Sequence, residues 1–156
     1  MKILFDGDML VHRMCAACEE RNPFDKTIVD KADPEETWKN IEMRINWCKE
    51  IILDHFEETS ADIVVCLSDD NRKEIFRQKV NPDYKQNRKG SEKPVLFYDM
   101  LEKTKRIYDC EMWKHLEGDD VMGLLQDSES VIVSGDKDML QIEGYHLNLI
   151  DPEQGV

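Results

Sequence analysis

The chain has 156 residues, of which 40% are hydrophobic and 35% are charged, and its formal net charge at pH 7 is −13. That length is enough for one domain with its own core, and the negative charge argues against a protein that coats nucleic acid by charge alone. The sequence has no run of eighteen apolar residues and no signal-peptide pattern, so we expect a cytoplasmic protein without a membrane segment.

The hydrophobic pattern predicts strands and helices that alternate along the chain. Apolar runs typical of strands lie at residues 3–5, 63–67, 111–113, 130–133 and 145–150. Helical spacing predicts helices over residues 9–19, 34–58 and 94–108, and a shorter one that ends at residue 126. Asp33 and Pro34 give the second helix a cap and a favoured first residue. Polar residues at 21–33 and 70–93 predict loops, the second with short helical pieces.

This alternation of strands and helices favours an α/β fold. Strands joined by crossover helices form a right-handed, mostly parallel sheet. The sequence shows no internal repeat and no low-complexity segment that would divide it. We therefore predict a single domain over residues 1–156.

Acidic residues fall in four short clusters, each where a predicted strand ends or the next helix begins. The clusters are Asp6 with Asp8, then Asp69, then Glu117 with Asp119 and Asp120, and last Asp136 with Asp138. Taken alone, an acid such as Asp8, Asp69 or Asp120 is better explained as a helix cap or first-turn residue. Because the functional crevice of a parallel sheet lies beyond the carboxyl ends of its strands, the four clusters together favour one shared site.

Carboxylates that converge in this way would destabilise the sheet edge unless cations neutralised them. A ligand set made only of oxygen atoms suits hard cations such as Mg²⁺ or Mn²⁺. Two such ions roughly 3.5 to 4 Å apart can activate a water and stabilise the leaving oxygen in phosphodiester hydrolysis. The clusters therefore predict a divalent metal site, and we expect two ions.

A basic segment interrupts the acidic chain. Residues 72–93 carry eight Lys and Arg residues and three Asp and Glu residues, so eight minus three gives a local charge of +5. Tyr84 lies between basic side chains, where an aromatic ring can stack on a base or sugar while Lys and Arg bind phosphate. The same pattern also fits a solvated basic loop.

Four stretches of the sequence resemble a known family. They are LFDGDMLVHR (4–13), VVCLSDDNRKEIFRQKVNPDYKQNRKG (64–90), HLEGDDVMGLL (115–125) and VIVSGDKDML (131–140). In this order they are similar to the successive motifs of the 5′-nuclease family, which includes flap endonucleases, the 5′-nuclease domains of DNA polymerases and phage 5′-to-3′ exonucleases. The likeness is strongest to the exonucleases of T-odd coliphages, through the DGD, PxYKxNRK, KPV, LEGDDVMG and DKD elements.

The resemblance implies a PIN-like fold, which is a three-layer α/β/α sandwich, and a role for most of the acidic residues. Four acids would hold or orient the first metal: Asp6, Asp69, Glu117 and Asp119. Three more would serve the first or the second metal, directly or through water: Asp120, Asp136 and Asp138. Asp8 ranks lower, because its position is less uniformly acidic in the family.

The resemblance also assigns the basic segment to the substrate. Lys85 and Arg88 match the basic residues that face the scissile phosphate, so both would act in catalysis, with Tyr84 beside them for stacking. Further contacts to nucleic acid would come from Arg72, Arg77 and Lys89.

The sequence departs from the family's pattern at its carboxyl end. The family continues past the last strand into a helical region that grips duplex DNA and adds an acidic pair to the second metal site, whereas this sequence stops at Val156. We therefore expect the C-terminal helical DNA-binding region to be absent, the second metal to bind weakly and duplex affinity to be low. The chain would then be a fragment, or a separate polypeptide would supply the missing half.

The preferred hypothesis is a Mg²⁺- or Mn²⁺-dependent nuclease that hydrolyses phosphodiester bonds of DNA, or of RNA primers, from a 5′ end or at a flap. If a phage encodes it, we expect it in the host cytoplasm. Two alternatives stay open. One is a non-catalytic or partner-dependent module that binds nucleic acid or protein on the same fold. The other is a PIN-type ribonuclease, although such chains lack the YKxNR segment.

Overall fold

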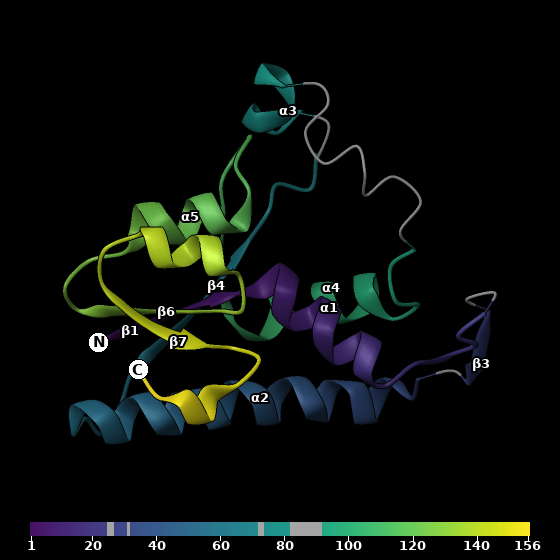
Figure 1. The fold of residues 1–156 in the computed structure, drawn as a ribbon, viewed down its shortest axis with the longest axis horizontal. Helices are drawn as coiled ribbons and strands as arrows, with labels where there is room; N and C mark the ends of the chain where they lie inside the picture. Colours follow the sequence, from purple (N-terminus) through teal and green to yellow (C-terminus); the bar gives the residue numbers. More distant parts are fainter. Residues whose placement is uncertain (25–26, 31, 72–73, 82–91) are drawn as a thin grey trace.

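A five-stranded parallel sheet forms the centre of the molecule. The computed structural model describes residues 1–24, 27–30, 32–71, 74–81 and 92–156. Within that part of the chain, the strand order of the main sheet is β5-β4-β1-β6-β7 (Figure 1). The strands are β1 (Lys2–Asp6), β4 (Asp62–Leu67), β5 (Asp109–Met112), β6 (Ser130–Ser134) and β7 (Tyr145–Asn148). All four neighbouring pairs are parallel, which confirms the predicted sheet.

Helices cover both faces of this sheet (Figure 1). One face is covered by α1 (Gly7–Ala17), α2 (Pro34–Phe56) and α4 (Phe97–Ile107), and the other by α5 (Gly118–Leu125) and the 3-10 helix η3 (Lys137–Gln141). In β1, Ile3 and Phe5 pack into the first core, whereas Leu4 packs into the second. Successive residues of a strand point to opposite faces, so a strand between two helical layers is apolar throughout. The predicted three-layer α/β/α fold is confirmed.

The longest helix, α2, begins where the sequence predicts. Asp33 accepts a hydrogen bond from the backbone N of Glu36 at 2.8 Å, and Pro34 is the first helical residue. The helix ends at Phe56 and is followed by Glu57 in the left-handed conformation, with φ of 56°. Its buried apolar side chains recur at helical spacing and belong to the first core: Trp38, Ile41, Ile45, Cys48 and Ile52.

Several element bounds differ from their prediction by about two residues, and two segments differ more. The loop expected over residues 21–33 contains a short antiparallel pair, β2 (Glu20–Arg21) and β3 (Ile28–Asp30), which is too short to show the alternation that marks a strand in sequence. The helix expected from residue 94 begins at Phe97. The carbonyl of Pro94 accepts a hydrogen bond from the backbone N of Phe97 at 3.0 Å, so a turn precedes the helix.

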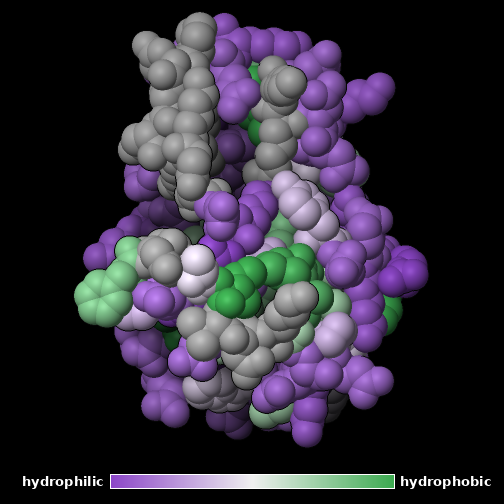
Figure 2. Space-filling model, turned by 90° about the vertical axis from the view of Figure 1, so that its right-hand side faces the viewer, coloured by the Kyte–Doolittle hydropathy of each residue, from purple (hydrophilic) through white to green (hydrophobic). Residues whose placement is uncertain are grey.

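The face drawn in Figure 2 is mainly hydrophilic, with a group of apolar side chains near its centre and others at its margins. Two short elements complete the fold: α3 (Phe76–Val80) and the 3-10 helix η4 (Pro152–Gln154). Among the described residues, no helix combines the length and the apolar character that crossing a membrane requires.

Glycine allows two helices to begin against the carboxyl end of β4. A Cβ atom on Gly118, the first residue of α5, would lie 3.0 Å from the carbonyl oxygen of Cys66. A Cβ atom on Gly7, the first residue of α1, would lie 2.4 Å from a methyl carbon of Val65. This close approach places the amino ends of both helices at the edge of the sheet where the acidic clusters lie.

Replacing Gly118 with alanine should lower the free energy of unfolding by about 1–3 kcal/mol, because the backbone of Cys66 lies in a central strand and cannot yield to the added methyl. Urea unfolding followed by circular dichroism measures this change. Gly123→Ala in the same helix is the control, since its Cβ would first meet the mobile end of Ile142 and alanine favours a helix. Equal destabilisation by both substitutions would contradict the close-approach argument.

Candidate metal centre at the sheet edge

Three carboxylates meet at the start of α5. Glu117 is the residue that precedes the helix, and Asp119 and Asp120 lie in its first turn. One carboxylate oxygen from each residue lies within 4.8 Å of the other two. Asp120 also accepts a hydrogen bond from the backbone N of Glu117 at 3.2 Å, which holds the turn in place. The positive end of the helix dipole offsets part of this negative charge, and a nearby cation would offset more of it.

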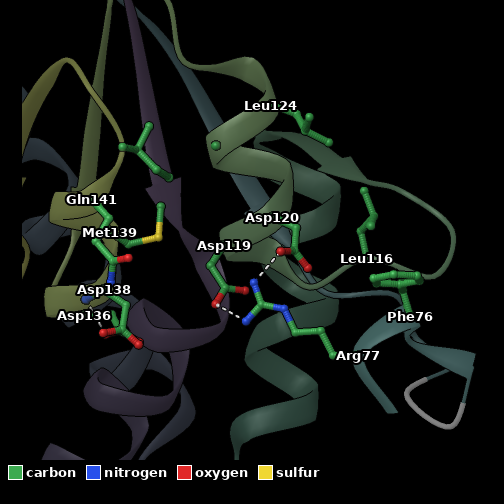
Figure 3. Close-up of a pocket in the computed structure, with 12 residues that line it drawn as sticks. Phe76, Arg77, Leu116, Asp119, Asp120, Leu124, Asp136, Asp138, Met139 and Gln141 are labelled. Carbon is green, nitrogen blue, oxygen red and sulfur yellow. Dashed lines mark hydrogen bonds and ion pairs between the residues drawn. The ribbon is translucent and has the colours of Figure 1, made fainter. Parts of the chain in front are cut away.

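The cation that the structure places there is the guanidinium of Arg77, from α3 (Figure 3). Its Nη1 atom lies 3.6 Å from Oε2 of Glu117 and 3.9 Å from Oδ2 of Asp119, and its Nη2 atom donates a hydrogen bond to Oδ1 of Asp120. Glu117 is 4% exposed, so at least one of the paired carboxylates is almost fully withdrawn from water. The three acids therefore already surround a positive charge.

Asp6 brings a fourth carboxylate to the same edge from the end of β1. It is buried, and its two oxygens accept hydrogen bonds from the backbone N of Met9 at 3.0 Å and from Oγ of Ser134 at 2.8 Å. Burial raises the pKa of Asp6 from 3.8 to about 6, and the charges of Asp8 and Asp119 act in the same direction. An acid whose charged form is disfavoured in this way is stabilised by a nearby cation.

Ser134 ties the fourth cluster to the first. Its hydroxyl donates to Asp6 and accepts from the backbone N of Asp136 at 3.1 Å. Asp136 in turn accepts a hydrogen bond from the backbone N of Asp138 at 3.0 Å, which caps η3. One serine at the end of β6 thus sets the relative position of two acidic clusters that are far apart in the sequence.

A cavity of about 690 Å³ separates two groups of acids. Asp119 and Asp120 lie on one side of it, and Asp136 and Asp138 on the side of η3 (Figure 3). Its lining also includes apolar side chains: Phe76, Leu116, Leu124, Met139 and Ile142. Four of the seven predicted metal ligands therefore line this cavity: Asp119, Asp120, Asp136 and Asp138. Glu117 belongs to the same carboxylate group as Asp119 and Asp120. Asp6 lies near enough to Asp119 for the charge of Asp119 to raise its pKa.

Asp69, the remaining predicted ligand, lies outside the three-carboxylate group. Its oxygens accept hydrogen bonds from the backbone N atoms of His115 at 2.7 Å and Asn71 at 3.0 Å, and these bonds hold the pKa of Asp69 below its ordinary value. In this arrangement Asp69 joins the end of β4 to the segment that leads into α5. Its role as a metal ligand stays a prediction.

Sequence reasoning missed two serines that organise the site. Ser68 donates its backbone N–H to Asp8 at 2.9 Å, and its Oγ accepts from the backbone N of Gly118 at 3.1 Å. Ser134 has the corresponding position at the end of β6. Each serine ends an apolar run and is followed within two residues by an aspartate, in LSDD and in VSGD. That repeated pattern is the signal that could have identified both, because a small hydroxyl at a strand end can satisfy the backbone groups of the next turn.

Of the predicted substrate contacts, the structure describes Arg77, and it lies among the acids. The others fall outside the described residues: Arg72, Tyr84, Lys85, Arg88 and Lys89. Their predicted roles therefore stay predictions.

The residues at this edge fit a hard divalent cation. Every side chain of the group offers oxygen, and Mg²⁺ and Mn²⁺ prefer oxygen ligands. The guanidinium of Arg77 is a stand-in for such a cation, since it contacts the three carboxylates that would act as ligands.

Comparison with known proteins identifies the family. Residues 1–155 match the family model described as 5′-3′ exonuclease, N-terminal resolvase-like domain. The chain belongs to this family. It is 31% identical over 159 residues to the exodeoxyribonuclease of Enterobacteria phage T3 and 30% identical to the exonuclease of Escherichia phage T7. Each match covers 90% of this chain and 48% of the relative, so the chain spans about half the length of these curated relatives.

Solved structures share the fold. The T5 5′-exonuclease with bound zinc superimposes with a TM-score of 0.55 at 13% identity, over 97% of this chain and 56% of that one. The bacteriophage T5 flap endonuclease, in a pseudo-enzyme–product complex with DNA and metal ions, gives a TM-score of 0.52 at 15% identity, over 96% and 55%. These likenesses confirm the PIN-like fold, and at such low identity they establish the fold alone.

The raised pKa of Asp6 predicts an unusual pH dependence for the metal-free protein. Between pH 3.8 and about 6 the folded chain binds more protons at Asp6 than the unfolded chain does, so this group's contribution to stability falls as pH rises through that window. The free energy of unfolding of Asp6→Asn should therefore exceed that of the wild type by on the order of 2–3 kcal/mol at pH 7. Near pH 4 the two proteins should be equally stable. Urea unfolding in EDTA from pH 4 to 7.5 measures it.

Asp127→Asn serves as the control of opposite sign. Hydrogen bonds from the backbone N of Glu129 and from Ser130 lower the pKa of Asp127, so removal of this carboxylate should destabilise the chain at neutral pH and matter less in acid. A difference between wild type and Asp6→Asn that does not change with pH would show that Asp6 keeps an ordinary pKa.

Proposed function

We propose that the chain is the metal-dependent core of a nuclease that hydrolyses phosphodiester bonds of DNA from a 5′ end or at a 5′ flap. The observation that supports this most is the group of Glu117, Asp119 and Asp120, whose oxygens surround a cation at the carboxyl end of a parallel sheet. Adjacent carboxylates at a sheet edge oppose stability, and a metal-dependent reaction explains why this edge carries them.

The chain's own residues supply ligands and their positions. Glu117, Asp119 and Asp120 would hold one Mg²⁺ or Mn²⁺ ion, and Asp136 and Asp138 across the cavity would serve a second. When bound, such ions lower the pKa of water and neutralise charge that develops on the phosphate. The capped turns at the starts of α5 and η3 keep the carboxylates in place, so little rearrangement is needed on binding.

DNA is the substrate that the comparisons favour. The relative from phage T3 is an exodeoxyribonuclease, and the flap endonuclease of bacteriophage T5 has been solved with DNA. The acidic rim of the cavity would repel a phosphodiester unless cations lay between them, and Lys85 and Arg88 would add positive charge on the substrate side. Cleavage of RNA primers would use the same chemistry, because the proposed ligands act on the phosphate and not on the sugar.

Binding of duplex DNA is the part of the proposed function to which this chain contributes least. Its net charge is −13, and the curated relatives are about twice as long as the region they share with it. A second candidate is a non-catalytic or partner-dependent module on the same fold, and the feature that favours it is that the match covers only about half of each relative. We assign duplex grip, and the choice between exonuclease and flap cleavage, to residues beyond the matched region, on the same or a separate polypeptide.

Asp119→Asn and Asp136→Asn should each reduce Mg²⁺-dependent cleavage by more than about a hundredfold, because loss of a ligand should exceed the 10–100-fold effect of losing an outer-shell partner. The assay follows 5′-labelled flap DNA, blunt duplex DNA and RNA of the same sequence, with Mg²⁺, Mn²⁺ or EDTA. Circular dichroism shows whether each variant keeps the fold.

Asp62→Asn provides the control, since Asp62 is exposed at the opposite end of β4 and should leave cleavage unchanged. Undiminished cleavage by Asp119→Asn would refute the metal-dependent assignment. Cleavage of RNA but not of DNA would establish the ribonuclease alternative, and DNA binding without cleavage would establish the non-catalytic module.

A further inference from the structure

Arg77 contacts the three carboxylates that the proposed metal site needs. Its two terminal nitrogens lie at 3.6 Å from Glu117, at 3.9 Å from Asp119 and at hydrogen-bond distance from Asp120. Figure 3 shows the guanidinium between Asp119 and Asp120, pointing away from its own helix and toward α5. One oxygen of each carboxylate also belongs to the group that could hold an ion. Arginine and metal therefore draw on the same side chains.

Both cations cannot occupy this place together. Mg²⁺ requires oxygen atoms at about 2.0–2.1 Å in nearly octahedral geometry, which would pull the three carboxylates inward around the ion. A guanidinium instead holds its carboxylate partners through N–H donors in a planar fork, and it cannot lose its charge. A divalent ion among these oxygens would also repel the guanidinium beside it.

The element that carries Arg77 is suited to move. None of the five residues of α3 is buried, and Phe76 and Val80 are 59% and 67% exposed. Its anchors among the described residues include the buried Ile75 just before it and a hydrogen bond from the backbone N of Phe76 to the carbonyl of His115, at 2.7 Å. Both anchors lie at the amino end of the helix, so the ion pairs of Arg77 add to its attachment and their loss need not unfold the core.

We propose that Arg77 is the resident counter-cation of the metal-free site, and that it must leave Glu117, Asp119 and Asp120 when a divalent cation binds. This rests on the proposed metal site. Arg77 then stabilises the metal-free protein, lowers its affinity for the metal and is released toward the cavity in the metal-bound state. Because binding free energies are reciprocal, whatever draws Arg77 away from the acids, such as a phosphate, strengthens metal binding.

The test measures metal binding directly, without an activity assay. Arg77→Gln should bind Mn²⁺ about tenfold more tightly than the wild type, within the usual range of coupling between sites, while its metal-free form melts at a lower temperature. Binding is followed by electron paramagnetic resonance of free Mn²⁺, and melting by circular dichroism in EDTA. Arg77→Lys keeps the charge without the planar fork, so its affinity should return toward that of the wild type.

Arg44→Gln is the matched control. Arg44 is an arginine of α2 whose Nη1 donates to the backbone carbonyls of Leu149 and Ile150, away from the acidic group. It should lower the melting temperature and leave the Mn²⁺ affinity unchanged. Unchanged or weaker Mn²⁺ binding by folded Arg77→Gln would overturn the counter-cation role, whereas no Mn²⁺ binding by the wild type would overturn the proposed metal site itself.

A measurement on the wild type covers the case in which the variant does not fold. The guanidinium NMR signals of Arg77 should show hindered rotation in EDTA, because two or more carboxylates hold its nitrogens. Saturation with Mg²⁺ should restore free rotation. Signals that stay hindered and unshifted at saturation would show that Arg77 and the metal bind together.

Discussion

Repulsion between carboxylates at the carboxyl edge of the sheet is the constraint on which the site depends. Glu117, Asp119 and Asp120 lie within one turn of helix, and Asp6 is buried beside them with a pKa raised to about 6. Carboxylates that lie this close together, with two of them buried, are stabilised by hydrogen-bond donors and by a cation that faces them. The structure supplies the donors from backbone N–H groups and Ser134, and it supplies the cation from Arg77.

The surrounding architecture keeps the acids in place despite that repulsion. Gly7 and Gly118 allow α1 and α5 to begin in contact with the end of β4, where a side chain would clash with Val65 or with the backbone of Cys66. Ser68 and Ser134 join neighbouring strand ends through their hydroxyl and backbone groups. The glycines and serines that make these contacts are buried. The cation that the described residues bring to the acidic group, in contrast, comes from α3, which buries none of its residues. The proposed ligands thus lie on elements of the core, and their counter-charge lies on an element without buried residues.

Comparison with known proteins establishes the family and the fold of this chain. The family model spans residues 1–155, and the fold matches the T5 5′-exonuclease over 97% of this chain. The curated phage relatives extend over about twice that length. The matched half carries the acidic edge, and the proposed function assigns the metal-dependent chemistry to it. In the sequence, the basic segment that includes Tyr84, Lys85 and Arg88 follows α3 and precedes α4.

The sequence by itself determined the order of strands and helices, the two-sided apolar core and the positions of the acids at strand ends. These features follow from local periodicity and capping, as the Ile3-Leu4-Phe5 run and the Asp33 cap show. Only the tertiary structure decided what each acidic cluster faces, because that depends on strand order and on donors from distant segments. It placed Glu117, Asp119 and Asp120 around Arg77, whereas the backbone of His115 and Asn71 engages Asp69. A carboxylate at a strand end either faces the site or accepts hydrogen bonds from a neighbouring loop, depending on which N–H groups the fold brings close to it. Those N–H groups come from other segments, so the local sequence does not predict which of the two occurs.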